Sequence, residues 1–111
     1  MSQSVVSFIE FGAGDPQAAG PFLAKLLGWK FHPMGKGGWF DTPMGRAGMH
    51  GDDPGQLYAY FAVADLDAAM ARVRELGGTA EAQGPGDSDF GRFADCAGPG
   101  GVKFGLHQRP R

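Results

Sequence analysis

The pattern of apolar and polar residues predicts a strand and then a helix at the start of the chain. Residues 5–11 are rich in β-branched and aromatic side chains and stop at a Gly-Ala-Gly turn, as strands do. Asp15 then supplies an N-cap, Pro16 suits the first helical position, and Gly28 ends the helix. The apolar face of this helix is predicted to comprise Ala19, Phe22, Leu23, Leu26 and Leu27. Short strands separated by Gly/Pro turns are predicted at residues 29–32, 38–42 and 46–50.

The same order of elements begins again in the second half of the chain. Residues 57–63 form a second strand pattern, Asp65 a second N-cap, and Gly77 a second helix stop. An offset of fifty residues aligns Asp15 with Asp65, and an offset of fifty-seven aligns residues 47–50 with 104–107. The second helix is predicted to present Leu66, Ala69, Val73 and Leu76 on its apolar face. Strands at 79–82, 91–96 and 102–107 complete the pattern, so that each half is predicted to be a βαβββ unit.

This duplication predicts an α+β chain made of two tandem βαβββ units. The first is expected at about residues 4–50 and the second at about 57–108, within a single domain spanning residues 1–111. A chain of 111 residues leaves no room for separate binding and catalytic domains. One core is therefore expected to carry the whole function.

Composition and charge exclude several classes of partner. The formal net charge is -2 and the ten basic residues are scattered, so the electrostatic footprint of a nucleic-acid-binding protein is missing. No apolar run approaches the length of about 20 residues that a membrane helix needs, and no leader opens the sequence. Cys96 is the single cysteine, which excludes an internal disulfide and favours a small buried side chain over a nucleophile. A cytoplasmic protein is expected.

Several short motifs, in this order and spacing, resemble the vicinal oxygen chelate superfamily, which includes glyoxalase I, extradiol dioxygenases and bleomycin resistance proteins. They are Asp15-Pro16 before a helix, Leu27-Gly28-Trp29 after it, the segment 61–68, the segment 91–94 and the segment 98–106. The resemblance implies mixed sheets curled into one open barrel-like cavity with the helices outside. It also implies a homodimer, since dimers are usual in that family.

The resemblance further implies four metal-ligand positions, on the first and last strand of each unit. Carried over one by one, they fall on Phe8, Gly48, Tyr58 and Gly105. Phenylalanine has no donor atom and glycine has no side chain, while a single tyrosine is a poor substitute for the His/Glu set that a divalent cation needs. No metal is therefore predicted at the family positions, and no cofactor is predicted.

Alternation along each strand then identifies the side chains that share the concave face with those four positions. Val5, Ile9 and Phe11 are expected to pack under the first helix instead. The aromatic members of the concave set either line a pocket for a planar ligand or belong to the core. The predicted ligand-binding residues are Phe8, Glu10, Trp39, Arg46, His50, Tyr58, Tyr60, Lys103 and His107.

Three of these residues form an alternative metal site. Glu10, His50 and His107 each lie two residues beyond a ligand-equivalent position, and together they make a two-histidine, one-carboxylate set suited to iron or zinc. The other interpretation places them at the rim, near the strand ends. Glu10 by itself is expected to lie near water, to pair with Arg46 or Lys103, or to act as a catalytic general base.

Three functions follow from these observations. The first is a small-molecule-binding protein similar to the bleomycin resistance proteins, without the family's usual metal. The second is a lyase, isomerase or dioxygenase that uses either the displaced metal set or Glu10 as a base. The third is a non-catalytic regulatory domain or subunit whose cavity has lost its use. Fold alone does not rank them.

Overall fold

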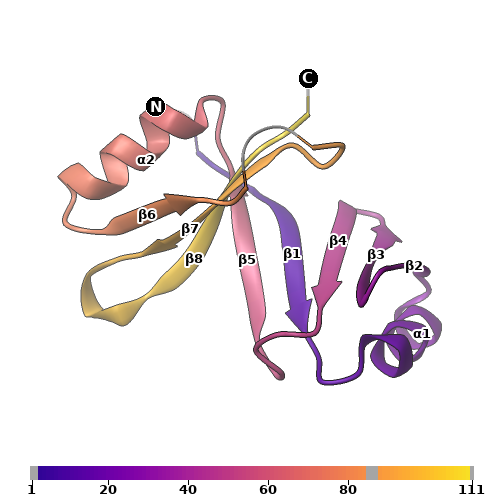
Figure 1. Ribbon diagram of the computed structural model, residues 1–111. Helices are drawn as coiled ribbons and strands as arrows, with labels where there is room; N and C mark the ends of the chain where they lie inside the picture. The colour runs from indigo at the N-terminus through magenta and orange to yellow at the C-terminus, as the bar shows by residue number, and fades with distance from the viewer. Residues whose placement is uncertain (1–2, 85–87, 111) are drawn as a thin grey trace. The chain divides into compact units, whose positions relative to one another are not determined.

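The computed structural model describes residues 3–84 and 88–110, and within them it contains eight strands and two α-helices (Figure 1). The first repeat comprises β1 (Val6–Gly12), α1 (Pro16–Leu27), β2 (Lys30–Met34), β3 (Gly37–Thr42) and β4 (Gly45–His50). The second comprises β5 (Leu57–Ala62), α2 (Leu66–Glu75), β6 (Thr79–Ala82), β7 (Arg92–Ala97) and β8 (Lys103–Gln108), with a 3-10 turn at Pro99–Gly101. The predicted α+β class and the twice-repeated βαβββ order are confirmed.

Both helices begin at the predicted caps. The Asp15 carboxylate accepts a hydrogen bond of 3.3 Å from the Ala18 N–H, and the Asp65 carboxylate accepts one of 3.1 Å from the Ala68 N–H. Each bond satisfies one of the amide donors that the first helical turn leaves without a partner. α1 ends at Gly28, whose φ of 73° lies in the left-handed region that glycine adopts without strain.

The chain divides into two compact units whose borders fall inside strands β1 and β5. The first compact unit comprises residues 8–58, and the second comprises residues 1–7 together with 59–111. The beginning of β1 therefore belongs with the second repeat, where the Val5 carbonyl accepts a hydrogen bond from the Ala62 N–H. The end of β1 stays with the first, where the Gly12 N–H donates to the Gln56 carbonyl.

Each compact unit contains a mixed sheet in which one parallel pair joins the first and last strands of the repeat. In the first compact unit β2, β3 and β4 pair antiparallel, and β1 pairs parallel to β4. In the second, β6, β7 and β8 pair antiparallel, and β5 pairs parallel to β8. The parallel pairs set which side chains of the repeat meet, because their register places Glu10 beside Gly48 and Tyr60 beside Gly105.

The core of the first compact unit lies between α1 and its sheet. Phe40, Ala47 and Met49 are buried there, and Ile9 and Phe11 pack against them as the strand alternation predicts. The Phe40 ring is surrounded by other aromatic rings, with centroid separations of 5.1–5.9 Å to Phe31, Trp29 and Phe11. Val5, by contrast, is exposed rather than packed under a helix, because it precedes the first residue of β1.

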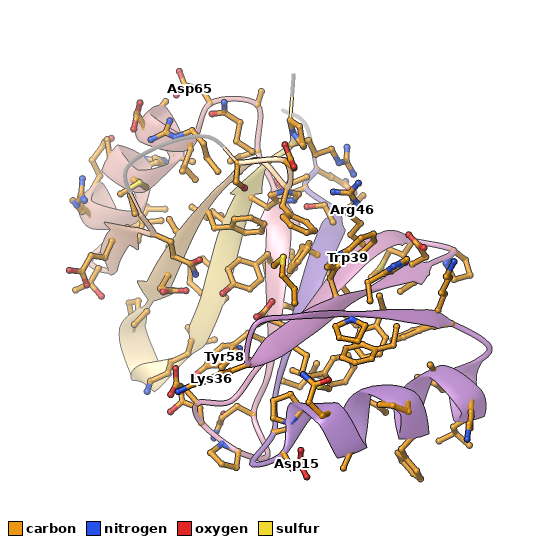
Figure 2. All side chains as sticks on the ribbon, turned by 45° about the vertical axis from the view of Figure 1, so that its right-hand side comes forward. Asp15, Lys36, Trp39, Arg46, Tyr58 and Asp65 are labelled. Atoms are coloured by element: carbon orange, nitrogen blue, oxygen red, sulfur yellow. The ribbon has the colours of Figure 1, made fainter. Side chains whose placement is uncertain are left out.

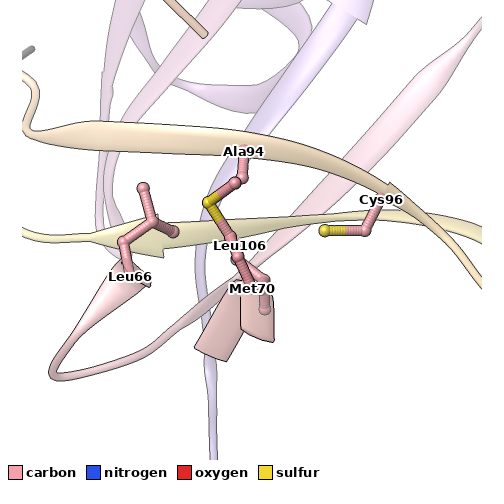
Figure 3. Close-up of a cluster of buried hydrophobic side chains, with 5 residues drawn as sticks. All are labelled: Leu66, Met70, Ala94, Cys96 and Leu106. Carbon is pink, nitrogen blue, oxygen red and sulfur yellow. The ribbon is translucent and has the colours of Figure 1, made fainter. Parts of the chain in front are cut away.

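The core of the second compact unit is formed by Leu66, Met70, Ala94, Cys96 and Leu106 (Figure 3). Burial, followed by the charge of Asp95, raises the pKa of the Cys96 thiol. The thiol is therefore protonated near neutral pH and acts as the small buried side chain that the sequence predicts. Within the described part of the chain, no helix has the length and apolar character to cross a membrane.

The predicted apolar face of α1 is wrong in part, because Phe22, Leu26 and Leu27 are exposed. The helix packs instead through Pro16, Gly20 and Ala24 together with two residues of the predicted face, Ala19 and Leu23. A Cβ placed on Gly20 would collide with the Phe31 ring, which shows how closely this ring approaches the helix backbone. The prediction gave most weight to the largest apolar side chains, and it therefore placed the buried face of α1 too far from Gly20. Leu76, which was predicted on the apolar face of the second helix, is also exposed.

Two leucine truncations test this packing. Leu66→Ala removes a side chain that is fully buried and is expected to lower the free energy of unfolding by about 2–5 kcal/mol. Leu26→Ala removes one that is 66% exposed and is expected to change it by less than about 0.5 kcal/mol. Urea denaturation followed by circular dichroism measures both values. An equal cost for the two variants would contradict the observed orientation of α1.

Candidate functional site

The sheet face opposite α1 in the first compact unit carries a row of polar and aromatic side chains. Strand register aligns His32, Trp39, Gly48 and Glu10 as successive neighbours across β2, β3, β4 and β1. Residues aligned in this way share one face of a sheet. Three of the four belong to the concave set expected from the sequence, whereas His32 was not predicted there.

Glu10 and His50 form the central contact on this face. Glu10 Oε1 lies 2.9 Å from His50 Nδ1, and the two side chains are 22% and 30% exposed, respectively. A carboxylate that is ionised has only acceptor atoms, so the hydrogen must reside on Nδ1 of the histidine. In this unit Glu10 therefore pairs with His50, a partner that the sequence did not suggest.

Gly48 makes this contact possible. A Cβ placed on Gly48 would collide with the Glu10 carboxylate, so any other residue would push the carboxylate aside. Gly48 is also one of the four positions at which the resemblance places a metal ligand. The Glu10 side chain of the adjacent strand thus occupies the space that a side chain at position 48 would need.

A second cluster on the same face surrounds Trp39. The His32 ring stacks on the Trp39 ring with centroids 3.9 Å apart, and His32 Nε2 lies 2.7 Å from Asp41 Oδ2. The guanidinium carbon of Arg46 lies 4.7 Å from the centroid of the Trp39 ring, in a cation–π contact (Figure 2). Arg46 thus holds a positive charge beside an aromatic ring on this face.

In the second compact unit the same position of the fold holds a tyrosine. A Cβ on Gly105 would collide with the Tyr60 ring, just as one on Gly48 would collide with Glu10. The Tyr60 hydroxyl donates a hydrogen bond of 3.1 Å to Asp95 Oδ1. Gln83 Nε2 donates to the Tyr60 hydroxyl oxygen at 3.0 Å and to Asp95 Oδ1 at 2.8 Å. Asp95 and Gln83 were missed from the sequence, although the pairing of Asp95 opposite Gly105 follows once the strand register is known.

His107 is held by two hydrogen bonds inside the second compact unit. Its Nε2 lies 2.6 Å from the Phe90 carbonyl oxygen, so this nitrogen must donate, and Nδ1 accepts from the Ser7 hydroxyl at 2.7 Å. The Phe93 ring stacks on the imidazole with centroids 4.5 Å apart. Burial lowers the pKa of His107, an effect that the Phe90 carbonyl opposes and the nearby charge of Arg109 reinforces.

The predicted site residues therefore divide between the two compact units. Glu10 and His50 meet, whereas His107 uses both ring nitrogens within the second unit. Within residues 3–84 and 88–110, no three or more His, Cys, Asp or Glu side chains are grouped so that they could hold a metal ion. Of the remaining predicted residues, Phe8 is buried, Tyr58 is half-buried and Lys103 is exposed.

Comparison with known proteins places this geometry in a known fold. No protein-family model matches the chain, and no curated protein matches it in sequence. Solved structures do. Methylmalonyl-CoA epimerase from Mycobacterium tuberculosis is similar with a TM-score of 0.74 at 15% identity, over 100% of this chain and 93% of that one.

Two further structures are similar over almost their whole length. Streptomyces coelicolor methylmalonyl-CoA epimerase in complex with 2-nitronate-propionyl-CoA has a TM-score of 0.70 at 18% identity, over 99% of this chain and 100% of that one. A Legionella pneumophila structure described as an NAD-dependent benzaldehyde dehydrogenase has a TM-score of 0.64 at 16% identity, over 93% and 98%. The chain has the vicinal oxygen chelate fold, the fold of methylmalonyl-CoA epimerase, as its motifs indicate. Identities this low establish the fold and leave function to be argued from the site.

Alanine at the two glycines tests how the site is built. Gly48→Ala is expected to lower the free energy of unfolding by about 1 kcal/mol, because the flexible Glu10 carboxylate can move away. Gly105→Ala is expected to cost more, up to about 3 kcal/mol, because the Tyr60 ring is buried. In a Glu10→Ala background the cost of Gly48→Ala should disappear. Denaturant unfolding of the four variants measures these energies; purely additive costs would exclude a clash with Glu10.

The buried imidazole predicts a loss of stability in acid. The pKa of His107 is lowered in the folded chain, so the unfolded chain binds more protons below about pH 6.5. Its contribution is complete above that pH, and the free energy of unfolding falls as pH decreases toward the folded-state pKa. Urea titrations between pH 7.5 and 5 should show a shallower decline for His107→Gln than for the unsubstituted chain, with His32→Gln as the control. If the free energies of unfolding of His107→Gln and of the unsubstituted chain fell equally with pH, His107 would not be the source of the loss of stability in acid.

Proposed function

We propose that this chain is a small-molecule-binding protein of the glyoxalase and bleomycin resistance type that binds its ligand without the family's usual metal. The observation that carries the proposal is the filling of Gly48 and Gly105, two of the four ligand-equivalent positions, by the Glu10 and Tyr60 side chains. A metal at these positions would need a donor where each glycine lies and would have to displace its neighbour's side chain. The other two positions are Phe8 and Tyr58, and neither restores a suitable donor set.

The face that carries Glu10, His50, Trp39 and Arg46 is the proposed binding surface. It combines an aromatic ring, a guanidinium and a carboxylate–imidazole pair on adjacent strands of one sheet. A few polar groups set among aromatic side chains is the usual composition of a ligand site. Because Arg46 and Glu10 differ in charge, we expect a ligand with both a polar and an aromatic or amphipathic part. A homodimer remains our expectation from the resemblance, and a cytoplasmic location remains our expectation from the composition.

Binding can be tested on metal-free protein. We expect a screen of small aromatic, amphipathic and acyl-CoA compounds, the last chosen because of the epimerase structures, to yield at least one that stabilises the chain after treatment with a chelator. A ligand at about 100 times its Kd adds about 2.7 kcal/mol, which is a rise in Tm of roughly 10 °C or more for a chain of this size. Thermal shift measures the rise, and elemental analysis of the untreated protein measures metal.

Variants identify the surface. Trp39→Ala and His50→Ala should weaken binding of the hit, whereas Lys25→Ala, on the exposed side of α1, should leave it unchanged. Stoichiometric zinc, iron, manganese or nickel binding that is lost in His50→Ala would overturn the metal-free proposal. A screen with no stabilising compound would favour a regulatory domain or subunit instead.

A further inference from the structure

We propose that Glu10 and His50 form a carboxylate–imidazole dyad in which Nε2 of His50 accepts a proton from the bound molecule, and that Gly48 is the residue that permits it. The inference rests on the proposed small-molecule site and adds the chemistry of its ligand. That ligand presents a weakly acidic proton to His50. The base is thus the histidine, and Glu10, which the sequence suggested as the base, orients it.

The hydrogen-bond geometry fixes which nitrogen is the base. Because the Glu10 carboxylate accepts at 2.9 Å, Nδ1 of His50 carries the hydrogen and Nε2 of the neutral ring carries the lone pair. No hydrogen bond to His50 Nε2 occurs among the residues that the structure describes. The His50 side chain is 30% exposed, so the ring is within reach of a bound molecule. A carboxylate that orients an imidazole and stabilises its protonated form is a recurring arrangement for a general base.

The other two histidines are held differently. His32 directs Nε2 toward Asp41, so the hydrogen of the neutral ring lies on Nε2. His107 donates from Nε2 to Phe90 and accepts at Nδ1 from Ser7. His50 is therefore the one histidine of the three, all of which lie in the described part of the chain, whose neutral ring carries its hydrogen on Nδ1. The two others serve as internal controls.

Proton transfer, and not acyl transfer, is the reaction that this dyad supports. Residues 8–58 contain neither serine nor cysteine, and the hydroxyl of their single threonine, Thr42, donates to the Gly45 carbonyl, so the dyad is paired with no nucleophile to activate. In the transfer, the ligand's bond to hydrogen breaks and its electron pair stays on the ligand. The proton forms a bond to Nε2, which gives an imidazolium beside the Glu10 carboxylate and an anionic ligand on a face that also carries Arg46. Charge and atoms balance without a co-reactant.

Gly48 acts as a positioning residue for the dyad. A side chain at this position would collide with the Glu10 carboxylate and remove it from Nδ1. Gly48→Ala should then change which ring nitrogen of His50 carries the hydrogen, although residue 48 does not itself bond to the histidine. Gly14→Ala is the matched control, because a Cβ there meets no atom within 4 Å.

The test measures the imidazole hydrogens directly by two-dimensional ¹H–¹⁵N NMR of the histidine rings above pH 7.5. We expect the hydrogen on Nδ1 for His50 and on Nε2 for His32 and His107. Glu10→Gln, whose amide oxygen still accepts, should retain the His50 pattern, whereas Glu10→Ala and Gly48→Ala should lose it and Gly14→Ala should not. A hydrogen on Nε2 of His50 in the unsubstituted chain would overturn the proposal.

Reactivity at Nε2 and proton transfer are measured separately. Acylation by diethyl pyrocarbonate, mapped by mass spectrometry, should be fastest at His50 and slowed in Glu10→Gln, because the stabilising charge is gone.

Proton transfer is followed with a nitrophenol, whose visible absorption reports its ionisation. It should bind as the anion to the unsubstituted chain, and the absorption of the anion should be lost in His50→Gln. Equal acylation of His50 and His107 would refute an open base. Nitrophenol that binds in its neutral form would refute proton transfer while leaving small-molecule binding intact, whereas no binding by any compound screened would refute the proposed function.

Discussion

The close approach of a long side chain to a glycine across a parallel strand pair determines which polar groups meet in each compact unit. Parallel pairing of β1 with β4 places Glu10 beside Gly48, and the same pairing of β5 with β8 places Tyr60 beside Gly105. In each pair a Cβ on the glycine would occupy the volume that its neighbour fills. In each pair the long side chain can therefore take its position only because its neighbour is a glycine.

This constraint is shared by the two repeats, but its chemical result differs. Glu10 is partly exposed and accepts a hydrogen bond from Nδ1 of His50, whose Nε2 makes no hydrogen bond to the described residues. Tyr60 is buried, and its hydroxyl is bound by Asp95 and Gln83 in a closed set of hydrogen bonds. Burying a phenol in this way stabilises structure, because each polar atom finds a partner. The carboxylate of the first compact unit thus stays partly exposed, while the phenol at the matching position of the second is buried and hydrogen-bonded.

Much of the fold was predictable because it depends on local signals that the chain repeats. Caps at Asp15 and Asp65 and the glycine at position 28 fixed both helix starts and the end of α1. The buried side of α1 was not predictable from hydrophobicity, since the helix packs through Gly20 against Phe31 and leaves Phe22 exposed. Close packing depends on shape, and a sequence of apolar residues does not show which of them has no room.

Strand alternation also placed Glu10 and His50 on one face, but it did not show that they touch or which nitrogen is bonded. Those features depend on the strand register. A shift of the register by one residue would move each side chain of the strand to the other face of the sheet. Register likewise explains why Asp95 was overlooked. Once β1 and β4 are aligned, the glycine at position 48 explains how the Glu10 carboxylate reaches the His50 imidazole, because a side chain there would occupy the same space.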